Sequence, residues 1–546
     1  MSFRIAFAKL GQYPNLTLAV IGSFSFVLCL LLGRANEPAG ITATVHRFFA
    51  ILAALFVFLL VAAMTIKKSD RRQSNIRYSL LLIVVFAVLF RLALLQQKPW
   101  LSNDIYRYLW DAQLSAHGVN PYALPPAADE LAEFRDATIY SKMDHKNVHS
   151  VYPPMLQLLF LAGRTVSQVF NLQFFVGLKL VFVLIDVGLV LALFRLLAQL
   201  QLDPRWAILY AWHPLPIVEI AGSGHTDGVG ACTLVLALLF LRQRKYFSAA
   251  LFFALGFLVK FITILFLPFL AVAIWNELNL QKAGRAVALF VLVIIAGYAP
   301  FMAAGEKLWS GLLVYSDKWR FNDGFFALVF SGVHRLLPDG LVKYLMIPSG
   351  WEINDVVMTT RRIDLALLIS KILCGGIFAF IYLRLLWQMF KSKSADELDW
   401  IIVFISILAA FFLLAPTLQP WYLLWLLPLL CLGGILDQHK ILSLPTRTSP
   451  EGPLSGRNQT SPQRHKVHKE NFVSFVPLWC KNFCFFSTDL TLKRLTLSLG
   501  IFSATVFLSY FVLENYLHSG VWQEPGWVKW VEYGIPFGVW LWMSRK

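Results

Sequence analysis

Long apolar runs separated by short polar loops constrain the fold of this chain more than any other feature. The runs are about 15 to 25 residues long, which is the length a helix needs to cross the hydrocarbon layer of a bilayer. Because they are continuous rather than alternating, they favour helices over a β-barrel. Only 14% of residues are charged, against roughly 25% in soluble domains. The sequence therefore predicts an all-α polytopic membrane protein.

Basic loops set the expected orientation, since short loops rich in Lys and Arg stay in the cytosol. The clearest markers are KKSDRRQSNIR from Lys67, RQRK from Arg242 and KSKS from Lys391. Placing them inside gives a bundle of about 14 transmembrane helices, with both termini inside. These helices are expected near residues 14–33, 47–66, 78–97, 174–198, 206–222, 227–241, 247–275 (two), 286–303, 364–386, 400–415, 421–436, 496–514 and 528–543.

The run 247–275 is counted twice because it is longer than one span requires and contains Lys260. We interpret it as a hairpin with Lys260 near the outer apex. The alternative is one tilted helix with a buried lysine.

The predicted organisation has a catalytic transmembrane core, with helices before and after it. Its two large outer loops carry interfacial helices, and a tract rich in Pro, Ser, Gly and basic residues is expected to be a disordered cytosolic insert. The segments are 1–77 for the N-terminal helices, 78–436 for the core, 98–173 and 304–363 for the outer loops, 437–495 for the insert and 496–546 for the C-terminal helices.

Composition excludes several other classes. The net charge of +17 resides in short loops, as the positive-inside rule predicts, so nucleic-acid binding is rejected. The 6 cysteines show neither a disulfide framework nor zinc-site spacing. The first apolar run has no small-residue cleavage site close behind it, so a retained helix is expected rather than a signal peptide.

The stretch NDIYRYLWDAQLSAHGVNPY, from Asn103, follows a predicted transmembrane helix directly. Asp104 and Asp111 are seven residues apart and would share a helix face. A carboxylate at a membrane edge can act as a general base on a hydroxyl, and neighbouring rings can stack on a sugar. The candidates beside the two acids are Tyr106, Arg107 and Tyr108. The alternative is an interfacial aromatic belt with solvated charges.

A second polar segment, HPLPIVEIAGSGHTDG, leads into another outer turn. Glu219 falls inside an apolar run, where ionisable groups are costly and usually functional. His225 and Asp227 could bind sugar hydroxyls or a phosphate. Two candidate ligands do not define a metal site, so no metal and no firm cofactor is predicted. The alternative is a tight turn with solvated polar groups.

Three further elements complete the candidate site. Lys260 lies among aliphatic and aromatic residues and needs an anionic partner, for which a lipid phosphate is one candidate and snorkelling the alternative. Arg320 in SDKWRFNDG suits a phosphate. Gln419 and Trp421 follow a proline-broken helix, where an aromatic belt is the alternative. All these segments fall on one membrane face, as an enzyme or transporter requires.

Four blocks resemble the GT-C superfamily of integral-membrane glycosyltransferases, which use polyprenyl-phosphate sugars. The resemblance is closest to bacterial and archaeal mannosyltransferase-like members, including those of the glycosyltransferase 87 type. The blocks are NDIYRYLWDAQLSAHGVNPY, HPLPIVEIAGSGHTDG, KFITILFLPF and QPWYLLWLLPL, and they span most of residues 80–436.

The resemblance implies an inverting transfer of a hexose, with mannose as the family-level expectation, to a glycan or glycolipid acceptor. It places the active site on the extracytoplasmic side of a bacterial plasma membrane, with Asp104 as the base and Lys260 near the donor phosphate. Related sequences often carry two adjacent acids, whereas this chain has Asn103 before Asp104. That departure disfavours chelation of a metal by an acidic pair.

Two other functions remain open from the sequence. A transporter or flippase of lipid-linked sugars would explain the aromatic outer surface and Lys260 without a catalytic Asp104. A non-catalytic assembly protein is the third reading. Loss of sugar transfer in an Asp104→Asn variant would favour the enzyme.

Overall fold

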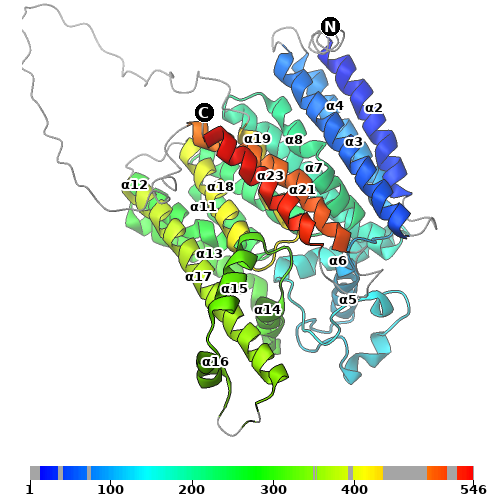
Figure 1. Cartoon of the computed structure of the whole chain (residues 1–546). Helices are drawn as coiled ribbons and strands as arrows, with labels where there is room; N and C mark the ends of the chain where they lie inside the picture. Colours follow the sequence, from blue (N-terminus) through cyan, green and yellow to red (C-terminus); the bar gives the residue numbers. More distant parts are fainter. Residues whose placement is uncertain are drawn as a thin grey trace, which may run out of the picture.

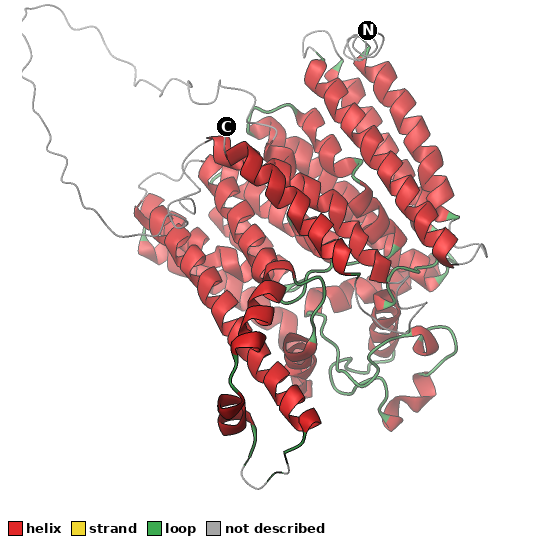
Figure 2. Ribbon diagram, viewed as in Figure 1, coloured by secondary structure: helices red, strands yellow, loops and turns green. Residues whose placement is uncertain are grey.

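The computed structural model describes residues 13–34, 41–69, 75–348, 351, 353–391, 397–433, 489–512 and 525–544. Over these ranges the chain consists of helices and loops, and the one β-type pairing is an isolated bridge between Phe321 and Thr417 (Figure 2). The all-α prediction is therefore confirmed for the part described. Most of the expected insert, 437–495, lies outside the described residues.

Six helices within the described ranges are long and apolar enough to cross a membrane, or seven if the bent pair α15 (Gly324–Leu336) and α16 (Asp339–Met346) counts as one span. The predicted count of about 14 is not confirmed. The six spans are α2 (Pro14–Gly33), α3 (Ile41–Lys68), α4 (Ile76–Leu95), α7 (Phe174–Gln199), α13 (Leu280–Tyr298) continued by η6 (Ala299–Ala304), and α17 (Asp355–Lys391).

Proline explains why one expected span is not a continuous helix. The segment predicted at 206–222 runs through η3 (Pro204–Ala207), α8 (Ile208–Ala211), α9 (Pro214–Pro216) and η4 (Ile217–Gly222), the last of which is a π-helical turn. Pro214 and Pro216 lack the N–H that a regular α-helix would use, so the backbone changes its hydrogen-bonding pattern there.

The remaining helices are shorter or lie in loops. They are α5 (Asp104–Ala116), η1 (Asp129–Phe134), η2 (Tyr140–Lys142), α6 (Pro154–Val169), α10 (Asp227–Arg242), α11 (Tyr246–Phe257), η5 (Phe261–Phe266), α12 (Leu267–Glu277), α14 (Lys307–Lys318), α18 (Glu397–Leu414), η7 (Pro420–Trp425), α19 (Leu427–Gly433), α21 (Asp489–Thr505), η10 (Val506–Tyr510) and α23 (Gly526–Ser544). Helix α21 begins seven residues before the expected start at 496, because the leucine-rich pattern of the sequence already starts at Leu490.

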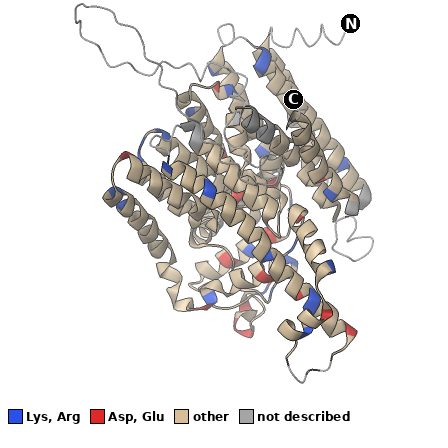
Figure 3. Ribbon diagram, turned by 60° about the vertical axis from the view of Figure 1, so that its left-hand side comes forward, with Lys and Arg blue, Asp and Glu red and all other residues tan. Residues whose placement is uncertain are grey.

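The helices form one bundle whose two ends differ. Helices α5, α14 and α16 lie at the lower end in Figure 1, whereas α2 begins and α23 ends at the upper end. Figure 3 shows charged residues mainly toward the helix ends, with acidic and basic residues together around the lower loops. The outer loops predicted at 98–173 and 304–363 thus lie at the same end of the bundle.

The run 247–275 folds as the predicted hairpin rather than as one tilted helix. Helix α11 leads to Lys260, and η5 and α12 return along α11. The hydroxyl of Thr263 donates to the carbonyl of Phe253 at 2.8 Å, and the rings of Phe253 and Phe266 stack with centroids 5.9 Å apart. Lys260 therefore lies at the apex of the hairpin.

Buried charged side chains link helices α4 and α7. The Arg91 guanidinium of α4 pairs with Asp186 of α7 and donates to the Ala211 carbonyl at 2.9 Å, with both charged side chains fully buried. The Lys179 ammonium donates to the carbonyls of Leu94 and Gln97 at 3.1 and 2.8 Å. These bonds fix the end of α4, from which the chain leads into α5.

Candidate active site

Helix α5 begins at Asp104, where the positive end of the helix dipole favours a carboxylate. The amide of Asn103 turns away and donates to Asp144 Oδ2 at 3.1 Å. Burial and the nearby Asp144 carboxylate raise the pKa of Asp104, Lys260 lowers it and Asp227 raises it, so that together they bring the pKa to about 6. The side chain is still 43% exposed, and this contact with solvent limits the shift. Asp104 is thus a solvent-reachable carboxyl group whose pKa lies above that of an ordinary aspartate.

The turn 223–226 brings His225 to Asp104. Gly224 has φ +81°, and a Cβ there would lie 2.7 Å from Ile105 Cδ1, so glycine permits both the backbone conformation and the close packing on α5. The His225 side chain is 1% exposed, and its Nδ1 lies 3.9 Å from Asp104 Oδ2. Burial and the charge of Lys260 lower the pKa of His225 well below its usual range, so the imidazole is neutral.

A second carboxyl group faces the other side of the same ring. Glu219, on the π-helical turn η4, is fully buried, and its Oε2 lies 3.5 Å from His225 Nε2. Its Oε1 accepts a hydrogen bond of 2.7 Å from the Tyr510 hydroxyl. The ring of His225 also stacks on Trp421, with centroids 3.6 Å apart and planes 14° from parallel.

Asp227 binds Lys260 directly, as the sequence suggested when it required an anionic partner for the lysine. Lys260 Nζ lies 2.6 Å from Asp227 Oδ1, which also accepts from the Trp425 indole at 2.8 Å. Asp227 is 3% exposed, whereas Lys260 keeps 34% of its side-chain surface exposed. The lysine can therefore meet a second anion without leaving the first.

Aromatic rings form a wall beside Lys260. Its Nζ lies 3.6 Å from the centroid of the Tyr422 ring, which is a cation–π contact. The Tyr422 hydroxyl bonds to that of Tyr315 on α14, so the second outer loop meets η7 at this point. Gln419, directly before η7, is half-buried.

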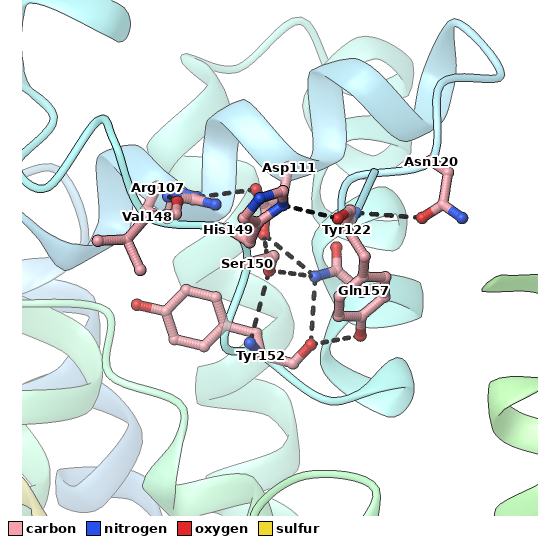
Figure 4. Close-up of polar contacts among 9 residues, drawn as sticks. All are labelled: Arg107, Asp111, Asn120, Tyr122, Val148, His149, Ser150, Tyr152 and Gln157. Carbon is pink, nitrogen blue, oxygen red and sulfur yellow. Dashed lines mark hydrogen bonds and ion pairs between the residues drawn. The ribbon is translucent and has the colours of Figure 1, made fainter. Parts of the chain in front are cut away.

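Arg107 and Asp111 bind the first outer loop through hydrogen bonds (Figure 4). Asp111 is fully buried and accepts from Arg107 Nε at 3.0 Å, Ser150 Oγ at 2.5 Å and Gln157 Nε2 at 3.1 Å. Arg107 also donates to the Val148 carbonyl at 2.8 Å. The sequence predicted that both bind substrate; in the structure they link α5, the loop and α6, because buried charges require polar partners.

Tyr106 and Tyr108 also belong to the packed interior rather than to an exposed sugar platform. They are 8% and 2% exposed, and Tyr108 stacks on Phe160 with ring centroids 4.8 Å apart. The stretch that looked like an aromatic surface is therefore mostly the buried face of α5, with Asp104 at its open end.

Arg320 belongs to a separate cluster on the second outer loop. Its Nε donates to Asp323 Oδ2 at 2.9 Å, and its guanidinium lies 4.0 Å above the Phe330 ring. Lys529 of α23 donates to the other Asp323 oxygen at 2.7 Å. Arg320, which the sequence suggested for a phosphate, is thus paired with Asp323 in this structure.

Several residues of this end were missed as site candidates from the sequence. Asp144, Tyr315, Trp425 and Tyr510 come from four separate segments, and of these only Trp425 lies in one of the four blocks that carry the family resemblance. Glu219 did give a signal, an acid in an apolar run. In the ranges that the structure covers, no group of three or more His, Cys, Asp or Glu side chains is arranged to hold a metal ion.

Two sequence models of known families match the chain. One, described as the N-terminal domain of alpha-(1->6)-mannopyranosyltransferase, matches residues 17–276, and the other, described as the MptB C-terminal domain, matches residues 352–435. Neither curated proteins nor solved structures gave a significant match. The first matched range contains Asp104, His225, Asp227 and Lys260, and the second contains Trp421.

Proposed function

The chain belongs to the alpha-(1->6)-mannopyranosyltransferase family and is a membrane glycosyltransferase; on this basis we propose that it moves mannose from a polyprenyl-phosphate donor to a glycan or glycolipid acceptor, with inversion. The proposal rests on the contacts of segment 222–228, which contains the turn 223–226 and the start of α10. Through His225 it reaches Asp104, and through Asp227 it holds Lys260. One short segment thus places a candidate base and a candidate phosphate-binding cation at the same end of the bundle.

Asp104 acts as the general base. Its carboxylate accepts the proton of the acceptor hydroxyl as the new bond forms between that oxygen and the anomeric carbon. The bond between the anomeric carbon and the donor phosphate oxygen breaks at the same time, on the opposite face of the sugar, which inverts the configuration. With a pKa raised to about 6, Asp104 is mostly ionised at pH 7 and more basic than an ordinary aspartate.

Lys260 stabilises the leaving group. The departing lipid phosphate gains negative charge, and a fixed cation beside it lowers the barrier because that charge develops in the transition state. The 34% exposed ammonium is held by Asp227 and by the Tyr422 ring, so it needs little reorganisation to meet the phosphate. Trp421 and Gln419 offer a ring face and an amide for sugar recognition.

The active end faces outward in this proposal. Lys67 and Lys68 end α3 and Lys391 ends α17, both at the end of the bundle opposite α5 (Figure 1). Arg242 ends α10 and donates to the carbonyl of Gln199, the last residue of α7. Short basic segments of this kind remain in the cytosol. The end of the bundle that carries α5 would then face outward, where a donor lipid in the outer leaflet can meet a water-borne acceptor.

Purified protein in liposomes, given radiolabelled polyprenyl-phosphate mannose and a panel of glycan and glycolipid acceptors, tests the function. We expect transfer by the wild type, loss of transfer in Asp104→Asn, and retention in Asp129→Asn, a matched acid that is fully exposed in the same loop. An arm with EDTA measures metal dependence, and the anomeric configuration of the product tests inversion.

Transfer by Asp104→Asn at the wild-type rate would overturn the assignment of the base. Glucose and galactose donors follow if mannose is not transferred. Movement of the lipid-linked sugar across the bilayer, without transfer from any donor, would instead identify a transporter.

A further inference from the structure

His225 is a buried ring between two acids, with no partner closer than these for its nitrogens. Its Nδ1 faces Asp104 at 3.9 Å and its Nε2 faces Glu219 at 3.5 Å. Neither nitrogen has a hydrogen bond to any described residue, and Glu219 Oε2 lacks one as well. Three buried polar atoms left unpaired beside a proposed base call for a functional explanation, because each costs free energy.

The protonation of Glu219 follows from its surroundings. An ionised carboxylate at 0% exposure would need a cation, but the ring beside it is neutral, and Tyr510 and Ser223 supply only hydroxyls. As a neutral acid, Glu219 satisfies the observed geometry. Oε1 would then be the carbonyl oxygen that accepts from Tyr510, and Oε2 would carry the proton toward His225 Nε2, 3.5 Å away.

The tautomer of His225 follows in turn. A neutral imidazole has one nitrogen that donates and one that accepts. If Nε2 accepts from Glu219, then Nδ1 carries the hydrogen and points at Asp104 Oδ2. The present 3.9 and 3.5 Å separations are long for hydrogen bonds, and such bonds tighten when substrate closes a site.

We propose that Tyr510, Glu219 and His225 form a directional hydrogen-bond chain that ends on Asp104 and that His225 is the positioning residue for this base. The chain keeps Asp104 ionised, because a donor favours the charged form of a carboxyl group. It also occupies Oδ2, which leaves Oδ1 for the acceptor hydroxyl. This inference rests on the proposed role of Asp104 as the base.

The scaffold holds the ring in this orientation. Stacking on Trp421 fixes the ring plane, and the His225 backbone N–H donates to the Glu219 carbonyl at 2.8 Å, so the acid and the ring move together. Tyr510 comes from η10, near the C-terminal end of the chain, and thereby connects the last helices to the site.

No net proton passes along the chain. The proton taken from the acceptor stays on Asp104 and leaves through its exposed side, while Glu219 and His225 keep theirs. The other titratable groups that act electrostatically on Asp104, His225 or Glu219 are Tyr108, Asp144, Tyr152, Asp227, Lys260, Tyr315, Tyr422 and Tyr510.

The dependence of transfer rate on pH tests the proposal. The wild type should lose activity as the pH falls through about 6, where Asp104 becomes protonated. His225→Phe keeps the stacking on Trp421 but removes the Nδ1–H that donates to Asp104. The acid limb of the pH–rate profile, where the rate falls as Asp104 is protonated, should therefore move up by roughly one to two pH units. His225→Asn, which restores an N–H near the position of Nδ1, should move the limb back toward that of the wild type.

The Glu219→Gln variant distinguishes a hydrogen-bond chain with a neutral Glu219 from one with an ionised Glu219. A glutamine amide accepts from Tyr510 and donates to Nε2 as a neutral acid does, so the acid limb should stay within about 0.3 pH unit of the wild type. Melting temperature in detergent controls for folding, and the exposed variant Asp129→Asn controls for loss of a surface acid.

An unchanged limb in His225→Phe would overturn the proposal, as would an upward shift in Glu219→Gln as large as that in His225→Phe. In either case loss of transfer in Asp104→Asn would leave the proposed function intact. If Asp104→Asn still transfers mannose, both the assigned base and the chain that ends on it are wrong.

Discussion

Asp104 and Asp111 lie on the same helix, seven residues apart, yet the structure places them in opposite environments. Asp111 is fully buried, and Arg107, Ser150 and Gln157 occupy its two oxygens. Asp104 is 43% exposed and faces His225, whose ring nitrogens have no hydrogen-bond partner among the described residues. The oxygens of Asp111 are therefore occupied by protein donors, whereas those of Asp104 remain available to a ligand.

Structural and catalytic charges on one amphipathic helix differ in how many of their hydrogen-bonding positions the protein itself occupies. A charge whose lone pairs are all filled by protein donors stabilises the protein and has nothing left to exchange with a substrate. A carboxyl group with a raised pKa, access to solvent and a nearby cation is suited to proton transfer. Substitutions can therefore tell whether a charged residue stabilises the fold or takes part in transfer.

Replacing Asp104 should have the largest effect. We expect Asp104→Asn to lower the transfer rate by about 100- to 10,000-fold, because the amide cannot accept the acceptor's proton. Its melting temperature should match that of the wild type, since the carboxylate is not part of the buried network. A large drop in melting temperature would put Asp104 with Asp111, on the structural side.

Lys260→Gln should slow transfer by about 100-fold, because it removes one fixed charge beside the leaving phosphate. Rate measurements over a range of donor concentrations would reveal the loss. Lys307→Gln, an exposed lysine at the start of α14, is the matched control and should leave the rate unchanged. Equal effects of the two substitutions would mean that the contribution is a general surface potential.

Acidification should inhibit the wild type by about tenfold per pH unit below the titration of Asp104. Asp104 has a raised pKa, so its carboxylate is present above about pH 6 and is lost as the pH falls through that value. Initial rates at pH 5, 6 and 7 would measure the limb. A limb near pH 4, typical of an unperturbed aspartate, would contradict the environment described for Asp104.

Asp111→Asn should act on stability rather than on chemistry. Breaking the buried pair with Arg107 should cost about 3 kcal/mol, because it leaves the guanidinium without its counter-charge. Thermal unfolding in detergent and proteolysis of the outer loop would both report this loss. The rate per folded molecule should change by less than about threefold, and a larger fall would give Asp111 a direct part in transfer.

Arg320→Gln should have the smallest effect. The guanidinium is paired with Asp323 and stacked over Phe330, and Lys529 also binds Asp323, so the loop keeps one cation when Arg320 is removed. We expect less than a fivefold rise in the KM for the donor, in line with a partly exposed ion pair. A loss comparable to that of Lys260→Gln would place Arg320 on the donor phosphate after all.

Local sequence was enough to predict an all-α membrane protein and the hairpin with Lys260 at its apex. Apolar runs of span length specify helices in lipid without reference to any other part of the chain, because the backbone must satisfy its own hydrogen bonds. Lys260 amid an apolar run likewise demanded an anion, and the structure supplies Asp227. These are local requirements, so local sequence reveals them.

Which polar side chains have their hydrogen-bonding atoms occupied by protein partners depends on the packing of distant segments. Asp104 and Asp111 are equivalent in sequence, and the difference comes from Ser150 and Gln157, which lie 39 and 46 residues away from Asp111 along the chain. The contact of Tyr510 with Glu219 spans 291 residues. The number of full spans also depended on how Pro214 and Pro216 redirect the backbone. Hydrogen-bond partners brought together by packing leave no trace in the spacing of a single sequence, and for that reason the division between structural and catalytic charges appears only in three dimensions.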